Sequence, residues 1–126
     1  MTVFEQTSAQ LQESLKAGNL TIADLTKEAF DRVEKLDGDV QAFLALNKEQ
    51  ATAHAAALDK VLFEERGPLF GLPIGVKDNI VTKGLRTTAA SHMLDNFTPI
   101  YDATVVEKIK AKNMIIIGKT NMDEFA

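Results

Sequence analysis

The stretch Gly67-Pro-Leu-Phe-Gly-Leu-Pro-Ile-Gly-Val-Lys-Asp-Asn-Ile80 presents two different faces if it forms a strand, because successive side chains of a strand point to opposite sides. One face is apolar and holds Phe70, Leu72, Ile74 and Val76; the other is nearly bare and holds Gly71, Pro73, Gly75 and Lys77. Glycine in a strand indicates a close approach by another group, and proline indicates an edge, a first residue or a bulge. Lys77 stands at the end of the bare face. It is therefore the candidate functional residue, and a solvated surface lysine is the alternative.

The composition excludes several classes of protein. With 126 residues, 45% hydrophobic and 25% charged, the chain is predicted to be folded rather than disordered. A net charge of −4 provides no basic surface for nonspecific binding of nucleic acid. The absence of cysteine excludes disulfides and thiolate sites. No secretory signal and no apolar run of about 18 residues is present, so we expect a soluble, cytoplasmic protein without a membrane contact.

Helical periodicity predicts three helices before Gly67. A first helix is expected from Thr2 to Lys16, a second from Thr21 to a turn at Asp37-Gly38, and a third over residues 47–62. Thr2 with Glu5 and Thr21 with Asp24 have the spacing of capping boxes. Residues 40–46 are short and apolar, which favours a strand or an extended segment.

A strand, helix and buried strand are predicted after Gly67. Lys83-Gly84 is expected to turn, and residues 87–90 to be extended. A helix is expected to begin at Asp102 or Thr104, the latter with Glu107 at capping-box spacing, and to turn Val105, Val106 and Ile109 inward. Residues 114–117 form an apolar, β-branched run that is typical of a strand buried on both faces in a parallel sheet. The polar segment that follows is interpreted as a loop.

Three other candidates for chemistry favour structural roles. Ser91 and His92 are adjacent, so on an extended segment they point to opposite faces and form no nucleophile and base pair. His54 lies in an alanine-rich helix without a second metal ligand at i+3 or i+4. Asp123 and Glu124 lack a third ligand, which favours a solvated loop or a helix start.

Four motifs in order resemble the amidase signature family. They are Gly67 to Ile80, Gly84 with Thr87-Thr88, Tyr101-Asp-Ala-Thr-Val105, and Ile117-Gly-Lys-Thr-Asn-Met-Asp-Glu-Phe-Ala126. Within the family, the last motif is most similar to the A subunits of glutamyl-tRNA(Gln) amidotransferases. The resemblance is strong from Gly67 onward and weaker over residues 1–66.

The resemblance implies a fold and a mechanism. The expected fold is α/β: the amino-terminal part of an α/β/α sandwich with a mixed, partly parallel sheet, preceded by helices. Residues 1–126 are then an incomplete amidase-signature domain, with a mainly helical segment over 1–66 and the lysine-bearing part of the α/β core over 67–126. Lys77 corresponds to the lysine of a Ser, cis-Ser, Lys triad, and Asp78 and Asn79 are expected to fix its turn.

A lysine base must be desolvated, because an ordinary lysine has a pKa of about 10.4 and is protonated at neutral pH. We expect the apolar flanks of Lys77 to provide this shielding. In the family, such a neutral lysine takes a proton, through the bridging serine, from the serine that attacks glutamine. The ammonia then passes to one of two partner subunits of a heterotrimer, which uses ATP and Mg²⁺ to activate glutamate on tRNA.

The chain itself is expected to bind no cofactor and no metal. Its only serines are Ser8, Ser14 and Ser91, none in the Gly/Ser-rich context that carries the family's two serines downstream. We therefore expect a piece of a larger protein that is inactive alone and that aggregates or loosens in isolation. A stand-alone amidase of the same family and a non-catalytic docking module are the alternatives.

Overall fold

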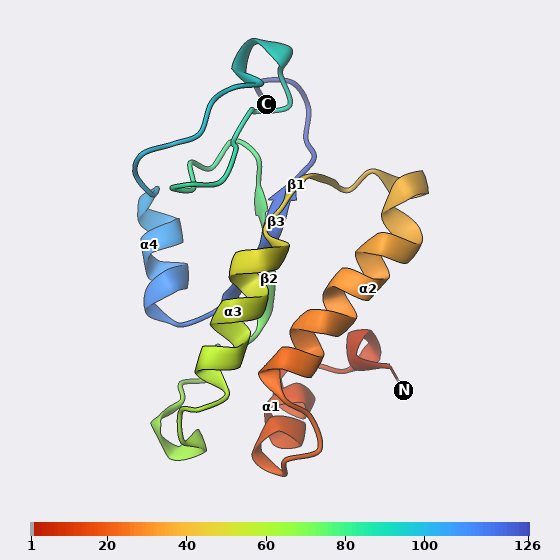
Figure 1. Cartoon of the computed structure of the whole chain (residues 1–126), viewed down its shortest axis with the longest axis vertical. Helices are drawn as coiled ribbons and strands as arrows, with labels where there is room; N and C mark the ends of the chain where they lie inside the picture. Colours follow the sequence, from red (N-terminus) through yellow and green to blue (C-terminus); the bar gives the residue numbers. More distant parts are fainter. Residues whose placement is uncertain (1) are drawn as a thin grey trace.

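The computed structural model describes residues 2–126 and contains a three-stranded sheet flanked by helices (Figure 1). The helices are α1 (Ser8–Lys16), α2 (Ile22–Val40), α3 (Lys48–Leu58) and α4 (Thr104–Ala111), and the strands are β1 (Phe43–Leu46), β2 (Pro73–Lys77) and β3 (Ile115–Thr120). Short 3₁₀ helices span Val3–Glu5, Phe63–Glu65 and His92–Leu94. Within this part of the chain, no helix is long and apolar enough to cross a membrane.

The sheet has the order β1, β3, β2, with β3 antiparallel to β1 and parallel to β2. Helices α2 and α3 lie on one side of it and α4 on the other (Figure 1). Ile115 and Ile117 pack with the α2 and α3 residues, whereas Ile116 packs with Val106 of α4 and Val76 of β2. The prediction of an α/β fold with a mixed, partly parallel sheet and a strand buried on both faces is confirmed. Because β1 precedes Gly67, residues 1–66 and 67–126 share one sheet.

Helix α2 begins where the sequence predicts, with reciprocal bonds between Thr21 and Asp24. The side chain of Thr21, and then its amide, which donates to Oδ2 at 3.1 Å, lower the pKa of the Asp24 carboxyl. The first turn of α2 has a second hydrogen-bond acceptor, Asp59, at the end of α3. Its carboxylate accepts hydrogen bonds from the amides of Ile22 and Ala23 at 2.7 and 3.0 Å. Amides in the first turn of a helix have no partner within it, so Asp59 stabilises α2 and joins it to α3.

Asp59→Ala is expected to lower stability by about 1 kcal/mol, the typical effect of losing an N-terminal cap. The measurement is the midpoint of thermal unfolding of the complete protein. Glu64→Ala is the matched control, because Glu64 is exposed and lies in the 3₁₀ turn after α3. Equal midpoints for the two variants would show that the Asp59 contacts contribute nothing.

Two helix boundaries predicted from sequence are wrong. The first helix is interrupted, because Thr7 is extended and forms a new capping box with Gln10 at the start of α1. Helix α2 does not turn at Asp37-Gly38 but continues to Val40 and ends with Gln41 in the left-handed region. There the Asp37 carboxylate accepts the amides of the two residues after Gln41, which fixes the exit from the helix.

Other expectations hold only in part. Helix α3 ends at Leu58 rather than Leu62, which is 65% exposed. Helix α4 has Ala103 at its N-cap, with no side-chain cap from Thr104, and Val105 faces outward. The extended segment predicted over residues 87–90 fails at its second half, because Ala89 and Ala90 lie in a turn with positive φ angles of 50° and 54°.

Candidate active-site lysine

Lys77 is the last residue of β2 and lies opposite Thr120 of β3. The side chain of the preceding Val76 is buried, whereas Lys77 is exposed. Across residues 2–126, the lysines whose Nζ forms a hydrogen bond or ion pair are Lys27, Lys48, Lys110 and Lys119, and Lys77 is not among them. The expectation that apolar flanks shield this amine is wrong for this part of the protein, because neighbours along a strand point to opposite faces. Any desolvation of Lys77 must come from groups across the sheet surface rather than from its sequence neighbours.

The backbone around Lys77 is held more tightly than its side chain. The Lys77 carbonyl accepts the amide of Ile80 at 3.0 Å, and the next amide, from Asp78, donates to the Thr120 carbonyl at 3.1 Å. The peptide unit between residues 77 and 78 is therefore bonded at both of its polar atoms. This arrangement fixes the direction in which β2 ends.

The glycines of the bare face do mark close approaches, as predicted. A Cβ built on Gly75 of β2 would lie 2.8 Å from a methyl carbon of Thr120. Pro73 is the first residue of β2, which is an edge strand, and the pairing with β3 shifts register after Ile74. Gly75 thus allows a close approach by another strand, and Pro73 lies at the start of an edge strand, as expected for these residue types in a sheet.

The most deeply buried charged group is Lys119 of β3, a residue that was predicted from the sequence to lie in a loop. Its side chain is 0% exposed, and its Nζ donates to the Ile80 carbonyl at 2.6 Å and to Oγ1 of Thr87 at 3.0 Å. Oδ1 of Asp78 lies 3.8 Å away. Burial lowers the pKa of Lys119, and the nearby Asp78 carboxylate opposes that shift. Residues 115–119 of β3 are all buried, so the strand continues past Gly118. Extending the predicted strand beyond Gly118 would have placed Lys119 in it.

Asp78 is the buried partner of Lys119 and directly follows Lys77. Its Oδ2 accepts the Thr88 amide at 3.0 Å and the Thr88 hydroxyl at 2.5 Å, and its carbonyl accepts the Ala89 amide at 2.9 Å. The Asp78 carboxylate thus bonds Thr88, ten residues further along the chain, rather than the amides of the local turn as the sequence predicted. Asn79 is exposed.

Ser91 and His92 diverge, as predicted. The buried Ser91 hydroxyl donates to Oε1 of Glu124 at 2.8 Å and accepts the amide of Met93. The imidazole of His92 points into solvent, where its Nδ1 lies 3.1 Å from Asp95. The two side chains therefore form no pair, and Ser91 instead gives Glu124 a defined partner.

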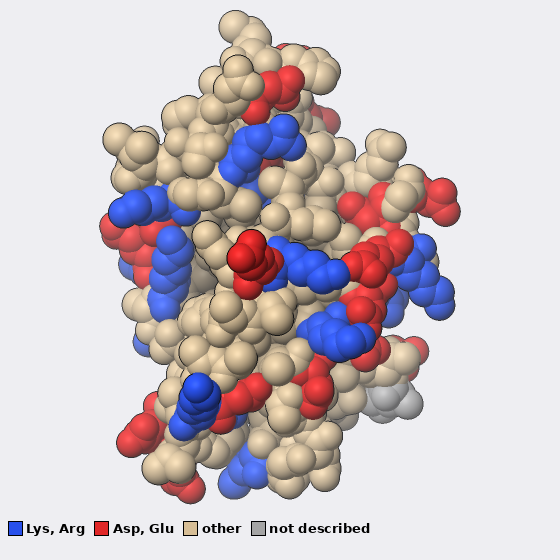
Figure 2. Space-filling model, in the orientation of Figure 1, with Lys and Arg blue, Asp and Glu red and all other residues tan. Residues whose placement is uncertain are grey.

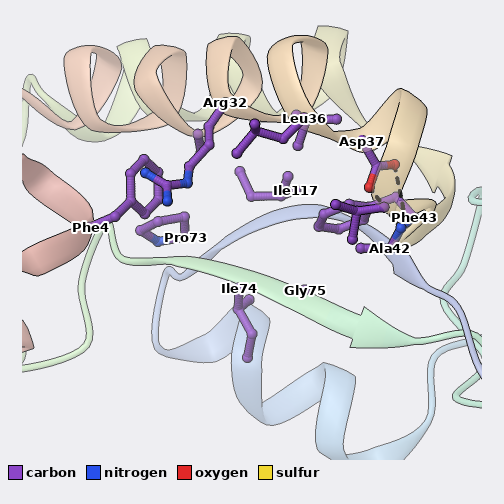
Figure 3. Close-up of a pocket in the computed structure, with 13 residues that line it drawn as sticks. Phe4, Arg32, Leu36, Asp37, Ala42, Phe43, Pro73, Ile74, Gly75 and Ile117 are labelled. Atoms are coloured by element: carbon purple, nitrogen blue, oxygen red, sulfur yellow. Dashed lines mark hydrogen bonds between the residues drawn. The ribbon is translucent and has the colours of Figure 1, made fainter.

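An apolar groove between α2 and β2 is separate from Lys77. It has a volume of about 340 Å³ and includes Phe4, Leu36, Phe43, Gly75 and Ile117 in its lining (Figure 3). Its two charged residues are already engaged: the Arg32 guanidinium lies 4.9 Å from the centre of the Phe4 ring, and Asp37 accepts backbone amides. The other residues that line the groove are apolar or glycine.

The charged side chains on the face shown in Figure 2 are of mixed sign. Figure 2 shows basic and acidic side chains interspersed over one face, without a continuous basic patch. Several are paired, including Lys27 with Asp31 and Lys48 with Glu34. Among residues 2–126 no three His, Asp or Glu side chains gather as a metal site, and His54 lies half-buried on α3.

The fold and these motifs have counterparts in known proteins. The family model described as Amidase matches residues 24–126, which is most of the chain. The chain belongs to the amidase family. The four sequence motifs resemble this same family, so the family membership predicted from the sequence is confirmed.

Named relatives of this amidase-family chain match all of its residues. It is 70% identical over 126 residues to the A subunit of the glutamyl-tRNA(Gln) amidotransferase of Lysinibacillus sphaericus, and 56% identical to that of Geobacillus kaustophilus. It spans 26% of the length of each. Among solved structures, the peptide amidase of Stenotrophomonas maltophilia matches with a TM-score of 0.89 and 35% identity, over 97% of this chain and 26% of that one. The chain thus spans about a quarter of the relatives that it matches.

Proposed function

We propose that this chain is the amino-terminal part of the glutamine-hydrolysing A subunit of a glutamyl-tRNA(Gln) amidotransferase. The observation that supports this most is the 70% identity, over all 126 residues, to such a protein. The chemistry is glutamine hydrolysis, which supplies ammonia for converting Glu-tRNA(Gln) to Gln-tRNA(Gln). The two serines of the triad belong to the remaining three quarters of the polypeptide, so residues 1–126 alone are inactive.

In this mechanism Lys77 is the base. The nucleophilic serine passes its proton through the bridging serine to Nζ of Lys77 while its oxygen attacks the side-chain amide carbon of glutamine. Nζ of Lys77 then returns this proton, through the bridging serine, to the leaving nitrogen as the C–N bond breaks and ammonia departs. Water hydrolyses the acyl ester to glutamate and restores the serine. The position of Lys77 at the carboxyl end of an edge strand, with its amine free of partners within residues 2–126, supports this role. The remaining polypeptide covers and desolvates the amine.

The partners follow from the same proposal. Two further subunits complete a cytoplasmic heterotrimer, and one of them uses ATP and Mg²⁺ to activate the glutamate on tRNA. Residues 1–126 bind no cofactor, and tRNA contacts come through the complex. The net charge of −4 and the mixed surface in Figure 2 agree with a protein that does not grip nucleic acid by itself.

The test is transamidation by the reconstituted complex. The complete protein is assembled with its two partners and given glutamine, ATP, Mg²⁺ and Glu-tRNA(Gln). We expect glutamate release and formation of Gln-tRNA(Gln), with both lost when the complete protein is omitted. Normal Gln-tRNA(Gln) formation from glutamine by the two partners without it would overturn the proposal.

A stand-alone amidase is the second candidate, favoured by the similarity to a peptide amidase. In that case the complete protein hydrolyses small or peptide amides without partners. The discriminating measurement compares amide turnover by the purified complete protein with turnover by the complex. Full activity of the lone protein on carboxyl-terminal amides, with no effect of the partners, would favour the amidase.

A further inference from the structure

The strand that carries Lys77 ends in a buried ionic cluster that the proposed mechanism does not use. The cluster consists of Lys119, Asp78, Thr87 and Thr88, all of them at most 5% exposed. A charged pair removed from water is costly unless its hydrogen bonds are satisfied, and a hydrophobic pair of similar volume often gives equal stability. Stability alone therefore does not account for this choice of residues.

The cluster acts on both sides of the turn that follows Lys77. The turn is closed by the bond from the Ile80 amide to the Lys77 carbonyl, and the Ile80 carbonyl is in turn held by Nζ of Lys119 at 2.6 Å. On the other side, the Asp78 amide is held by β3, and its carboxylate is held by Thr88. Both ends of this turn are thus attached to a buried charge.

A second observation agrees with a functional demand at this place. Ala89 and Ala90 adopt left-handed φ angles, which are unfavourable for residues with a Cβ and persist only where their surroundings enforce them. The Ala89 amide is bonded to the carbonyl of Asp78, and the Ala89 carbonyl accepts the amide of Phe125. The backbone strain therefore lies directly against the residue that follows Lys77.

We propose that Asp78 and Lys119 are positioning residues, which hold the peptide after Lys77 so that its side chain leaves the sheet in one fixed direction. Neither touches substrate; each acts through the backbone of Lys77. The proposal rests on the proposed role of Lys77 as the base. Because a displacement of about 1 Å can lower a rate by about 100-fold, losing the cluster is expected to impair turnover more than binding.

The test uses the complete protein in its complex and the variants Asp78→Asn, Lys119→Met and the double variant Asp78→Asn/Lys119→Met. The double variant leaves no unpaired buried charge, so it remains informative if Lys119→Met fails to fold. Lys110→Met is the matched control, because it breaks the ion pair that the exposed Lys110 of α4 forms with Asp102, outside the cluster. For glutamine hydrolysis per mole of assembled complex, we expect kcat to fall by about 10- to 100-fold in Asp78→Asn and in the double variant, with KM unchanged.

A merely structural role gives a different result. In that case the amount of assembled complex falls, but the remaining complex turns over at the wild-type kcat, and this outcome overturns the proposal. Lys77→Arg is measured alongside. If Lys77→Arg is inactive while Asp78→Asn and the double variant keep the wild-type kcat, the positioning role fails and the proposed base stands. If Lys77→Arg itself keeps full activity, the role of Lys77 fails and the positioning proposal is overturned with it.

Discussion

Replacing Lys77 with arginine in the complete protein is expected to lower the rate of glutamine hydrolysis by about 10²- to 10⁴-fold, the usual contribution of a positioned acid or base. Arginine keeps the positive charge and hydrogen-bonding capacity, but it stays protonated and takes no proton from a serine. The measurement is kcat for glutamate release by the assembled complex. A loss this large with the charge retained identifies proton transfer, rather than charge, as the contribution of Lys77.

Lys83→Arg is the matched control for this substitution. Lys83 is also an exposed lysine, located six residues further along in the turn before Gly84, and its backbone amide rather than its side chain is bonded to Asp102. We expect Lys83→Arg to keep the wild-type kcat. Equal rates for the two variants would remove Lys77 from the mechanism.

The second large effect is expected at Gly118 in the central strand. A Cβ built at this position lies 2.3 Å from the carbonyl oxygen of Ala45 and 3.2 Å from the Cα of Leu46, both in the backbone of β1. Backbone atoms in a paired strand cannot move aside as a flexible side chain can. Gly118→Ala is therefore expected to separate β1 from β3 and to destabilise the protein by about 1–3 kcal/mol or more, as overpacking does.

Gly38→Ala supplies a control of opposite sign. Gly38 lies in α2 with no atom within 4 Å of a built Cβ, and alanine is better than glycine in a helix by about 0.5–1 kcal/mol. In thermal unfolding of the complete protein, we expect the midpoint to fall for Gly118→Ala and to stay or rise for Gly38→Ala. A Gly118→Ala protein that melts at the wild-type temperature would contradict the close approach of the two strands.

The sequence predicted the sheet better than it predicted the helix ends. The apolar run at residues 114–117 was enough to identify a strand buried on both faces, because local composition carries that information. The end of α2 depends instead on an Asp37 side chain that bonds amides beyond the helix and on a left-handed Gln41. Neither feature is visible in the helical pattern.

The candidate site was predicted in one part and missed in another. Lys77 was selected from the glycines and proline around it, and its role as a base stays a prediction. Lys119 was assigned to a loop because it opens the polar segment that follows the apolar run and Gly118. Its partners, Ile80, Thr87 and Asp78, lie 32 to 41 residues earlier in the chain, and only folding brings them together.

The most direct measurement is a crystal structure of the complete protein that resolves the side chain of Lys77. We predict that Nζ of Lys77 is covered by residues beyond 126 and lies within hydrogen-bonding distance, about 2.6–3.2 Å, of a serine hydroxyl. An Nζ that extends into bulk solvent with no serine hydroxyl in reach would contradict the assignment of Lys77 as the base.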